Sequence, residues 1–313
     1  MNVLDRISEG RVLFDGAMGT MLIARGLSLG RPPEQWNLDH PSLVRDVHLA
    51  YVQAGAEVIG TNTFGGSPGR LASFGLGRPA GKFNTAGVLL ARDAVSVVAG
   101  TRETVDDEDR DAPLRGSPVP SRFVALSIGP TGKMLSPVGK TPPEEITDEI
   151  AEQVLGTKTP YDMILLETMF DLREALLAVA AAKKHASVPV AATLTFMKNP
   201  RGFFTIMGDE PSIAMRKLEA VGADVVGANC TIASAEMIEL ARKIRESTDL
   251  PLLCQPNAGK PRVKDGLPVY DQTPAEFARD ALALFAAGIN AVGGCCGTTP
   301  QFIREVRAGM SRH

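Results

Sequence analysis

The feature that most constrains the fold of this chain is a series of eight short apolar runs separated by helical patterns. The runs are residues 12–14, 57–60, 122–128, 162–166, 190–195, 224–227, 252–255 and 290–293. They are too short for helices, and their continuous apolarity indicates parallel strands buried on both faces. Amphipathic helical patterns lie between them, as at residues 42–53, 171–184 and 274–287. Eight strand–helix units predict a single-domain (β/α)8 TIM barrel over residues 1–313 rather than an open doubly wound sheet.

Composition excludes several classes of protein. A hydrophobic content of 44% is that of an ordinary globular protein with a sizeable core. A formal net charge of −3 gives no electrostatic case for a nucleic acid or an anionic membrane. The N-terminus lacks a signal-peptide pattern, and no apolar run reaches transmembrane length. Four cysteines in 313 residues are not a disulfide framework, so we expect a reducing cytoplasm.

One segment interrupts the alternation of strands and helices. Residues 101–122 contain the acidic run 106–111 and three prolines. The segment precedes the third predicted strand, so it belongs at the end of the barrel away from the strand C-termini. We expect a solvated, mobile loop.

Polar side chains recur where the predicted strands end. They are Asp15, Asn62, Glu167, Cys230, Asn257, Cys295 and Cys296. In a parallel barrel the active site is built at the C-terminal ends of the strands. We therefore expect these residues to gather at one end of the barrel.

The first and fourth strand ends carry carboxylates. Around Gly16 and Ala17, backbone N–H groups could approach a ligand carboxylate closely, although a glycine-rich turn capped by Asp15 explains the same residues. Glu167 follows a strongly apolar run. Together Asp15 and Glu167 could clamp an ammonium group, with a structural salt bridge as the alternative. Asn62 is expected only to brace its own loop.

Two of the four cysteines, Cys295 and Cys296, are adjacent and follow the eighth predicted strand. Successive residues of a strand point to opposite faces, so both thiols can reach one metal only if the chain turns there. Glycines within residues 293–297 permit that turn. Cys230 ends the sixth strand, near enough to join the pair. Cys254 lies inside the seventh strand and is expected to be a core thiol.

Three thiolates at strand ends predict a zinc site, and three protein ligands leave one coordination position open for chemistry. Buried core thiols or a vicinal disulfide are the alternatives. Three thiolates on Zn²⁺ sum to a net charge of −1, which suits deprotonation of a fourth thiol better than activation of water. None of the histidines (His40, His48, His185 and His313) falls at a predicted strand end, and each is expected at the surface.

Taken in order, these motifs make the sequence similar to the homocysteine S-methyltransferase family, whose members share a zinc-bearing (β/α)8 barrel. The likeness extends from about residue 11 to residue 305. Its segments are residues 15–20, 36–41, 61–64, 129–131, 167–168, 229–230, 256–259 and 294–300.

The resemblance implies zinc ligation by Cys230, Cys295 and Cys296. Within the family, residues 256–259 and 295–300 look most like the homocysteine module of cobalamin-dependent methionine synthase. There the asparagine that matches Asn257 can be the fourth zinc ligand when substrate is absent.

The resemblance also implies how the amino acid is held. Asp15 and Glu167 would receive the amino group of homocysteine, and backbone amides around Gly16 and Ala17 would lie near its carboxylate.

The function implied is a zinc-dependent transfer of a methyl group to the thiol of homocysteine, which yields methionine. Methionine synthase continues into folate, cobalamin and reactivation modules, whereas this sequence ends at His313. The first expectation for the donor is therefore methylcobalamin carried by a separate corrinoid protein. S-methylmethionine, S-adenosylmethionine or betaine is the alternative donor, and another small thiol the alternative acceptor. A non-catalytic zinc-binding scaffold is a third possibility.

Residues 198–210 do not match the methionine synthase module. They follow the fifth predicted strand on the catalytic rim. They either shape the donor or acceptor pocket or form a divergent surface loop.

Overall fold

Eight parallel strands form the centre of the computed structural model, which describes residues 1–77, 79–100, 122–264 and 267–312. The strands are β1 Val12–Leu13, β2 Val58–Gly60, β3 Phe123–Ile128, β4 Met163–Met169, β5 Val190–Leu194, β8 Val225–Ala233, β9 Leu252–Asn257 and β12 Ala291–Val292. Their order in the sheet is β1-β12-β9-β8-β5-β4-β3-β2. A parallel bridge between Phe14 and Val58 brings the β1 segment beside β2 and closes the barrel.

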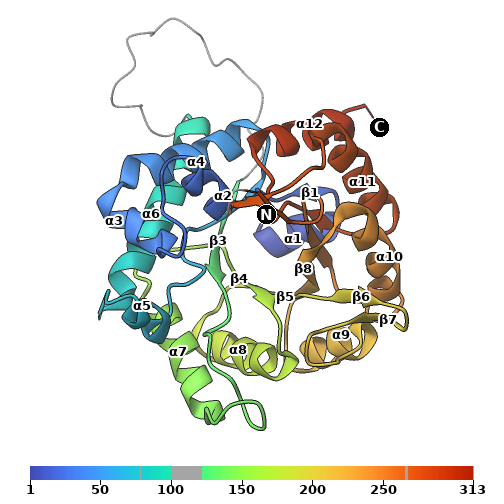
Figure 1. Cartoon of the computed structure of the whole chain (residues 1–313). Helices are drawn as coiled ribbons and strands as arrows, with labels where there is room; N and C mark the ends of the chain where they lie inside the picture. The colour runs from blue at the N-terminus through green and yellow to red at the C-terminus, as the bar shows by residue number, and fades with distance from the viewer. Residues whose placement is uncertain (78, 101–121, 265–266, 313) are drawn as a thin grey trace, which may run out of the picture.

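Helices surround the strands (Figure 1). They are α1 Val3–Glu9, α2 Met18–Ile23, α3 Trp36–Asp39, α4 Pro41–Gln53, α5 Pro68–Ser73, α6 Ala80–Val98, α7 Pro143–Gly156, α8 Leu172–His185, α9 Pro211–Ala220, α10 Ser234–Arg245, α11 Pro274–Ala286 and α12 Pro300–Met310, with a 3₁₀ turn at Pro33–Gln35. Proline occupies the start of α7 and α11, and Thr273 and Glu276 form a capping box at α11. The predicted (β/α)8 barrel and its eight strands are confirmed.

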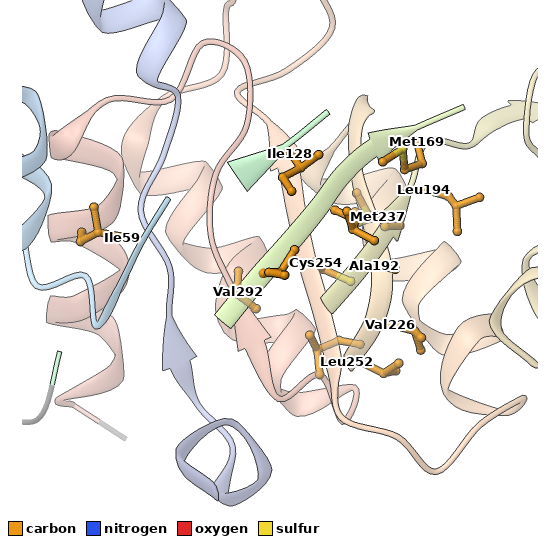
Figure 2. Packing of buried hydrophobic residues seen from close by; sticks show 14 of the residues in the cluster. Ile59, Ile128, Met169, Ala192, Leu194, Val226, Met237, Leu252, Cys254 and Val292 are labelled. Carbon is orange, nitrogen blue, oxygen red and sulfur yellow. The ribbon is translucent and has the colours of Figure 1, made fainter. Parts of the chain in front are cut away.

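Alternate residues of each strand build two separate cores. On β3, Phe123 and Ala125 point into the barrel, whereas Val124 and Leu126 pack between the sheet and the helices. Figure 2 shows part of the outer core, including Cys254, which is fully buried as expected for a core thiol. The interior of the barrel is therefore packed with apolar side chains.

Two antiparallel hairpins extend the loops at the C-terminal ends of strands. One pairs β6 Met197–Asn199 with β7 Gly202–Phe204, and the other pairs β10 Arg262–Lys264 with β11 Leu267–Val269. The acidic loop expected at 101–122 lies outside the described residues except for its last position. In the described part of the chain, no helix has both the length and the apolarity needed to cross a membrane.

One expectation about the histidines was wrong. His48 is fully buried in α4, where its position repeats the buried face formed by Val44, Val47 and Tyr51. Neither ring nitrogen has a hydrogen-bond partner among the described residues, and burial lowers the pKa of His48 to about 3. The imidazole serves as an apolar filler here. Of the others, His40 is exposed, His185 is half-buried, and His313 lies outside the described residues.

This burial predicts acid-induced destabilisation. The pKa of His48 is depressed in the folded protein, because burial favours the neutral imidazole. The contribution of His48 to the free energy of unfolding is therefore fully present above the ordinary pKa of 6.5 and is lost as the pH falls toward 3. Between pH 8 and pH 5 the free energy of unfolding should fall by about 2 kcal/mol more in the wild type than in His48→Leu. Urea unfolding at the two pH values measures the difference, and parallel losses in both proteins would contradict the assignment.

Candidate functional site

A polar layer covers the C-terminal end of the barrel interior. The inward positions of β3 run Phe123, Ala125 and then Ser127, and those of β4 run Met163, Leu165 and then Glu167. A cavity of about 400 Å³ opens above this layer. It is lined by residues from several strand ends, including Asp15, Ser127, Glu167, Cys230, Gln255 and Cys296. Every second residue of these strands points inward, so the residues that follow the apolar interior, Ser127 and Glu167, face the cavity.

Three thiols meet at this cavity. The Sγ atoms of Cys230, Cys295 and Cys296 lie within 4.8 Å of one another, and those of Cys230 and Cys296 are 3.8 Å apart. Sulfur ligands about 2.3 Å from a tetrahedral metal lie about 3.8 Å from each other, so the spacing fits one metal ion. All three cysteines are half-buried and free. Hydrogen bonds from Cys230 and Cys295 lower the pKa of the Cys296 thiol, and the contacts with Cys230 and Cys296 raise the pKa of Cys295.

Irregular backbone aims Cys230 at the cluster. The pairing of β8 with β9 shifts register between Asn229 and Ala233, and the φ angles of Cys230 and Thr231 are 58° and 63°. These left-handed conformations are costly for residues other than glycine, and a β-branched threonine is especially strained in them. Such strain persists only where the surrounding structure holds it, and here the closed barrel supplies that support.

Asn229 connects the thiols to the fourth strand. Its Oδ1 accepts hydrogen bonds from the Thr168 N–H at 2.7 Å and the Thr193 hydroxyl at 2.8 Å. Its Nδ2 donates to Thr168 Oγ1 at 2.8 Å and lies 3.9 Å from Cys295 Sγ. Thr168 is itself in the left-handed region, with a φ of 60°. One amide therefore holds a strained residue beside Glu167 and provides an N–H to a thiol.

The turn after β12 brings the adjacent cysteines together. Gly293 must be a glycine, because a Cβ there would lie 2.7 Å from Phe14 Cβ. Gly297 has a φ of 82°, which favours glycine. The Cys295 N–H donates to the Pro256 carbonyl at 2.8 Å. The glycines expected to permit this turn do so, and the turn is fastened to the end of β9.

Two carboxylates lie in the same cavity. The Gly60 N–H donates to Asp15 Oδ2 at 2.9 Å, and the Ser127 hydroxyl donates to Glu167 Oε1. Burial raises the pKa of Asp15 well above its ordinary value, and the Glu167 charge adds to the rise while the Gly60 bond opposes it. Burial likewise raises the pKa of Glu167 to about 7, opposed by Ser127. Among the described residues neither carboxylate has an ion-pair partner, so a structural salt bridge does not account for them.

The loop after β1 supplies backbone donors. The Ala17 N–H donates to Thr298 Oγ1 at 3.1 Å, so this amide is already engaged. Tyr51 donates to the Ala17 carbonyl at 3.1 Å and holds the loop in place. Met18 and Gly19 begin α2 after an alanine that provides no cap, and their N–H groups lack intrahelical acceptors. Both residues line the cavity.

The remaining predicted positions have different surroundings. Asn62 donates to the Pro33 carbonyl and to Asn37 Oδ1, both at 2.8 Å, so it braces its loop as expected. Asn257 is buried, and within the described part of the chain its Oδ1 has no hydrogen-bond partner. Its neighbour Ala258 donates to the Cys296 carbonyl at 3.0 Å, which places this segment beside the thiols. The hairpin within 198–210 contributes no residue to the cavity lining.

Sequence reasoning missed three groups in the site: Ser127, the amide of Asn229, and Gln255. Each lies on a strand at an inward position that follows the apolar interior residues. The period of two along each strand could have identified them, since Ser127 and Gln255 lie two residues beyond the last inward apolar residue and Asn229 lies four beyond Val225.

Comparison with known proteins shows the family of the chain. The sequence model of the family described as homocysteine S-methyltransferase matches residues 12–310. The chain belongs to the homocysteine S-methyltransferase family, which confirms the resemblance of its motifs.

Relatives include methionine synthases and a solved methyltransferase. The chain is 33% identical over 324 residues to methionine synthase from Mycobacterium tuberculosis and 31% identical over 325 residues to that from Mycobacterium leprae. These alignments cover 99% of this chain and 25% of each relative, so the chain spans about a quarter of their length. The metallated homocysteine methyltransferase MmuM from Escherichia coli superposes with a TM-score of 0.75 at 23% identity, covering 95% of this chain and 96% of that one.

The contacts of Asn229 predict its effect on the metal. Asn229→Leu removes the amide beside Cys295 and the support of Thr168, and it should weaken Zn²⁺ binding about 10- to 100-fold. Competition with a chromophoric chelator measures this affinity. The matched control is Thr193→Val, which removes one bond to Asn229 but no contact with the thiols, and its loss should be smaller. Equal losses in both variants would refute a specific role for the amide.

Proposed function

We propose that this chain transfers a methyl group to the thiol of homocysteine to give methionine, in a zinc-dependent reaction. The observation that carries the proposal is the meeting of three thiols and two carboxylates in one cavity. The thiols form a site for a soft metal, and the carboxylates form a site for a cation. A small molecule with a thiol at one end and an ammonium at the other satisfies both.

The donor set favours zinc, because thiolate ligands select soft or borderline metals. Zinc bound there would lower the pKa of a fourth, incoming thiol and present its sulfur as a thiolate. Cys230, Cys295 and Cys296 would hold the ion. We assign Asn257 as the ligand that substrate displaces, because its buried Oδ1 has no other partner and lies on the segment bonded to the Cys295–Cys296 turn.

The carboxylates orient the amino acid. Removing Asp15 and Glu167 from water disfavours their charged forms, and an ammonium placed between them offsets that cost. At the other end of the amino acid, the N–H groups of Met18 and Gly19 would receive the substrate carboxylate. Gly16 allows the loop after β1 to pack closely against Thr298, since a Cβ at this position would lie 2.6 Å from Thr298 Oγ1. Together these contacts fix the sulfur for in-line attack, and such positioning supplies much of the rate.

For the donor we propose methylcobalamin held by a corrinoid-binding protein or module. The support is the relation to methionine synthases, of which this chain spans about a quarter. S-methylmethionine, S-adenosylmethionine and betaine are the competing donors. A metal site built from reduced thiols agrees with a cytoplasmic protein.

Zinc content tests the proposed centre. Cys296→Ala should lose stoichiometric zinc and methyl transfer together, because two thiols remain where three are needed. The matched control is Cys254→Ala, since Cys254 is a fully buried thiol outside the cluster. This control should keep both its zinc and its activity. Measurement of zinc by atomic absorption alongside methionine formation decides the outcome, and full turnover by Cys296→Ala would sink the proposal.

Parallel assays identify the donor. Zinc-loaded protein and homocysteine are supplied in turn with methylcobalamin, a methylated corrinoid protein, S-methylmethionine, S-adenosylmethionine and betaine. We expect methionine with the corrinoid donors. Turnover with a sulfonium or betaine alone would reject the corrinoid donor but keep the acceptor chemistry. No methionine from any donor, with zinc and thiol bound, would reject the methyltransferase itself.

A further inference from the structure

Gln255 is a buried polar side chain of the site to which the proposed reaction assigns no role. Gln255 lies on β9 with 4% of its surface exposed, and it lines the cavity. Its Oε1 is buried and has no hydrogen-bond partner among the residues that the structure describes. A buried acceptor without a donor is costly, and nearly all such atoms in proteins find a partner. The free acceptor therefore points to a ligand that brings a hydrogen-bond donor.

Gln255 lines the same cavity as the two carboxylates. Gly293 follows β12, the strand between β9 and β1, and a Cβ on it would be 3.2 Å from Gln255 Cγ and 2.9 Å from the Asp15 carbonyl oxygen. Because Gly293 has no side chain, it does not separate the Gln255 side chain from the Asp15 backbone. Glu167 completes the polar lining from the opposite side, on β4.

An ammonium group has three N–H donors. Asp15 and Glu167 each use one carboxylate oxygen for a protein donor, Gly60 or Ser127, and each can offer the other to a ligand. Two carboxylates thus leave one N–H unmet. We propose that Gln255 Oε1 accepts this third hydrogen bond and so helps to select thiols that carry an amino group. This inference rests on the proposed function.

The charge of the cavity decides which end of the substrate Gln255 meets. The two carboxylates that line the same cavity attract a cation and repel an anion. The backbone amides proposed above for the substrate carboxylate come instead from the chain that follows β1. Gln255 therefore presents its oxygen, rather than its NH₂ group, to the amino end.

Three small thiol ligands distinguish a contact with the amino group from a contact with the carboxylate. Homocysteine has both end groups, 3-aminopropanethiol lacks the carboxylate, and 4-mercaptobutanoate lacks the amino group. Their binding to zinc-loaded wild type and Gln255→Met is measured by titration calorimetry, with no methyl donor present. Methionine matches glutamine in length but offers no comparable acceptor. Affinity for the two amines should fall about 10- to 100-fold, the size of a lost hydrogen bond to a charged group, and that for 4-mercaptobutanoate less than about twofold.

Two further variants control the result. Gln255→Glu restores an acceptor and should recover amine binding, which also keeps the test decisive if Gln255→Met folds poorly. Glu167→Gln supplies a reference for lost recognition of the amino group, because it should discriminate among the three thiols in the same direction.

Three outcomes would overturn the inference. Equal losses for all three thiols would make Gln255 a packing residue. A loss confined to 4-mercaptobutanoate and homocysteine would assign it to the substrate carboxylate. Unchanged affinities would remove it from recognition altogether. All three leave the methyltransferase proposal standing. By contrast, wild-type protein that holds zinc but binds none of the thiols would reject the proposed function, and the role of Gln255 with it.

Discussion

The alternation of side chains along a closed parallel sheet is the constraint on which the structure depends. Each strand must point every second residue at the barrel axis, where only apolar groups can be buried without partners. The inward series therefore runs through residues such as Ala125 and Leu165 until it reaches the cavity. There the same series continues as Ser127, Glu167 and Gln255. One geometric rule thus produces both the core and the floor of the site.

The backbone departs from regular strand geometry at the strand ends that carry the site. Thr168, Cys230 and Thr231 adopt left-handed backbone, and β4 and β8 both shift register where these residues occur. A flexible loop would relax such conformations. The barrel holds them because the strands on either side are fixed, and Asn229 ties two of the strained segments together. Three of the four residues other than glycine that have a positive φ in the described part of the chain therefore carry or lie next to a thiol or a carboxylate of the site.

The charge of the site explains its preference for ligands. Three thiols and two carboxylates share one cavity, and burial raises the pKa of both acids. Ionising all five groups together would be prohibitively costly without compensating positive charge. The proposed divalent metal at the sulfurs and ammonium at the oxygens would supply it, and each would favour the ionised form of its own ligands. On this proposal, binding of the metal and binding of the amino acid would each neutralise part of the same negative charge.

The sequence by itself determined the barrel, its eight strands, and the residues that the strand ends present, because short apolar runs and strand-end polar groups are local signals. It also singled out Cys254 as a core thiol, since that residue lies within an apolar run. It misjudged His48, because the burial of a helix face depends on what packs against it. Only the tertiary structure decided that Ala17 gives its N–H to Thr298, that Asn229 reaches Cys295, and that Gln255 keeps a free acceptor. Those contacts join residues from different strands and loops, and no local pattern specifies distances across a barrel.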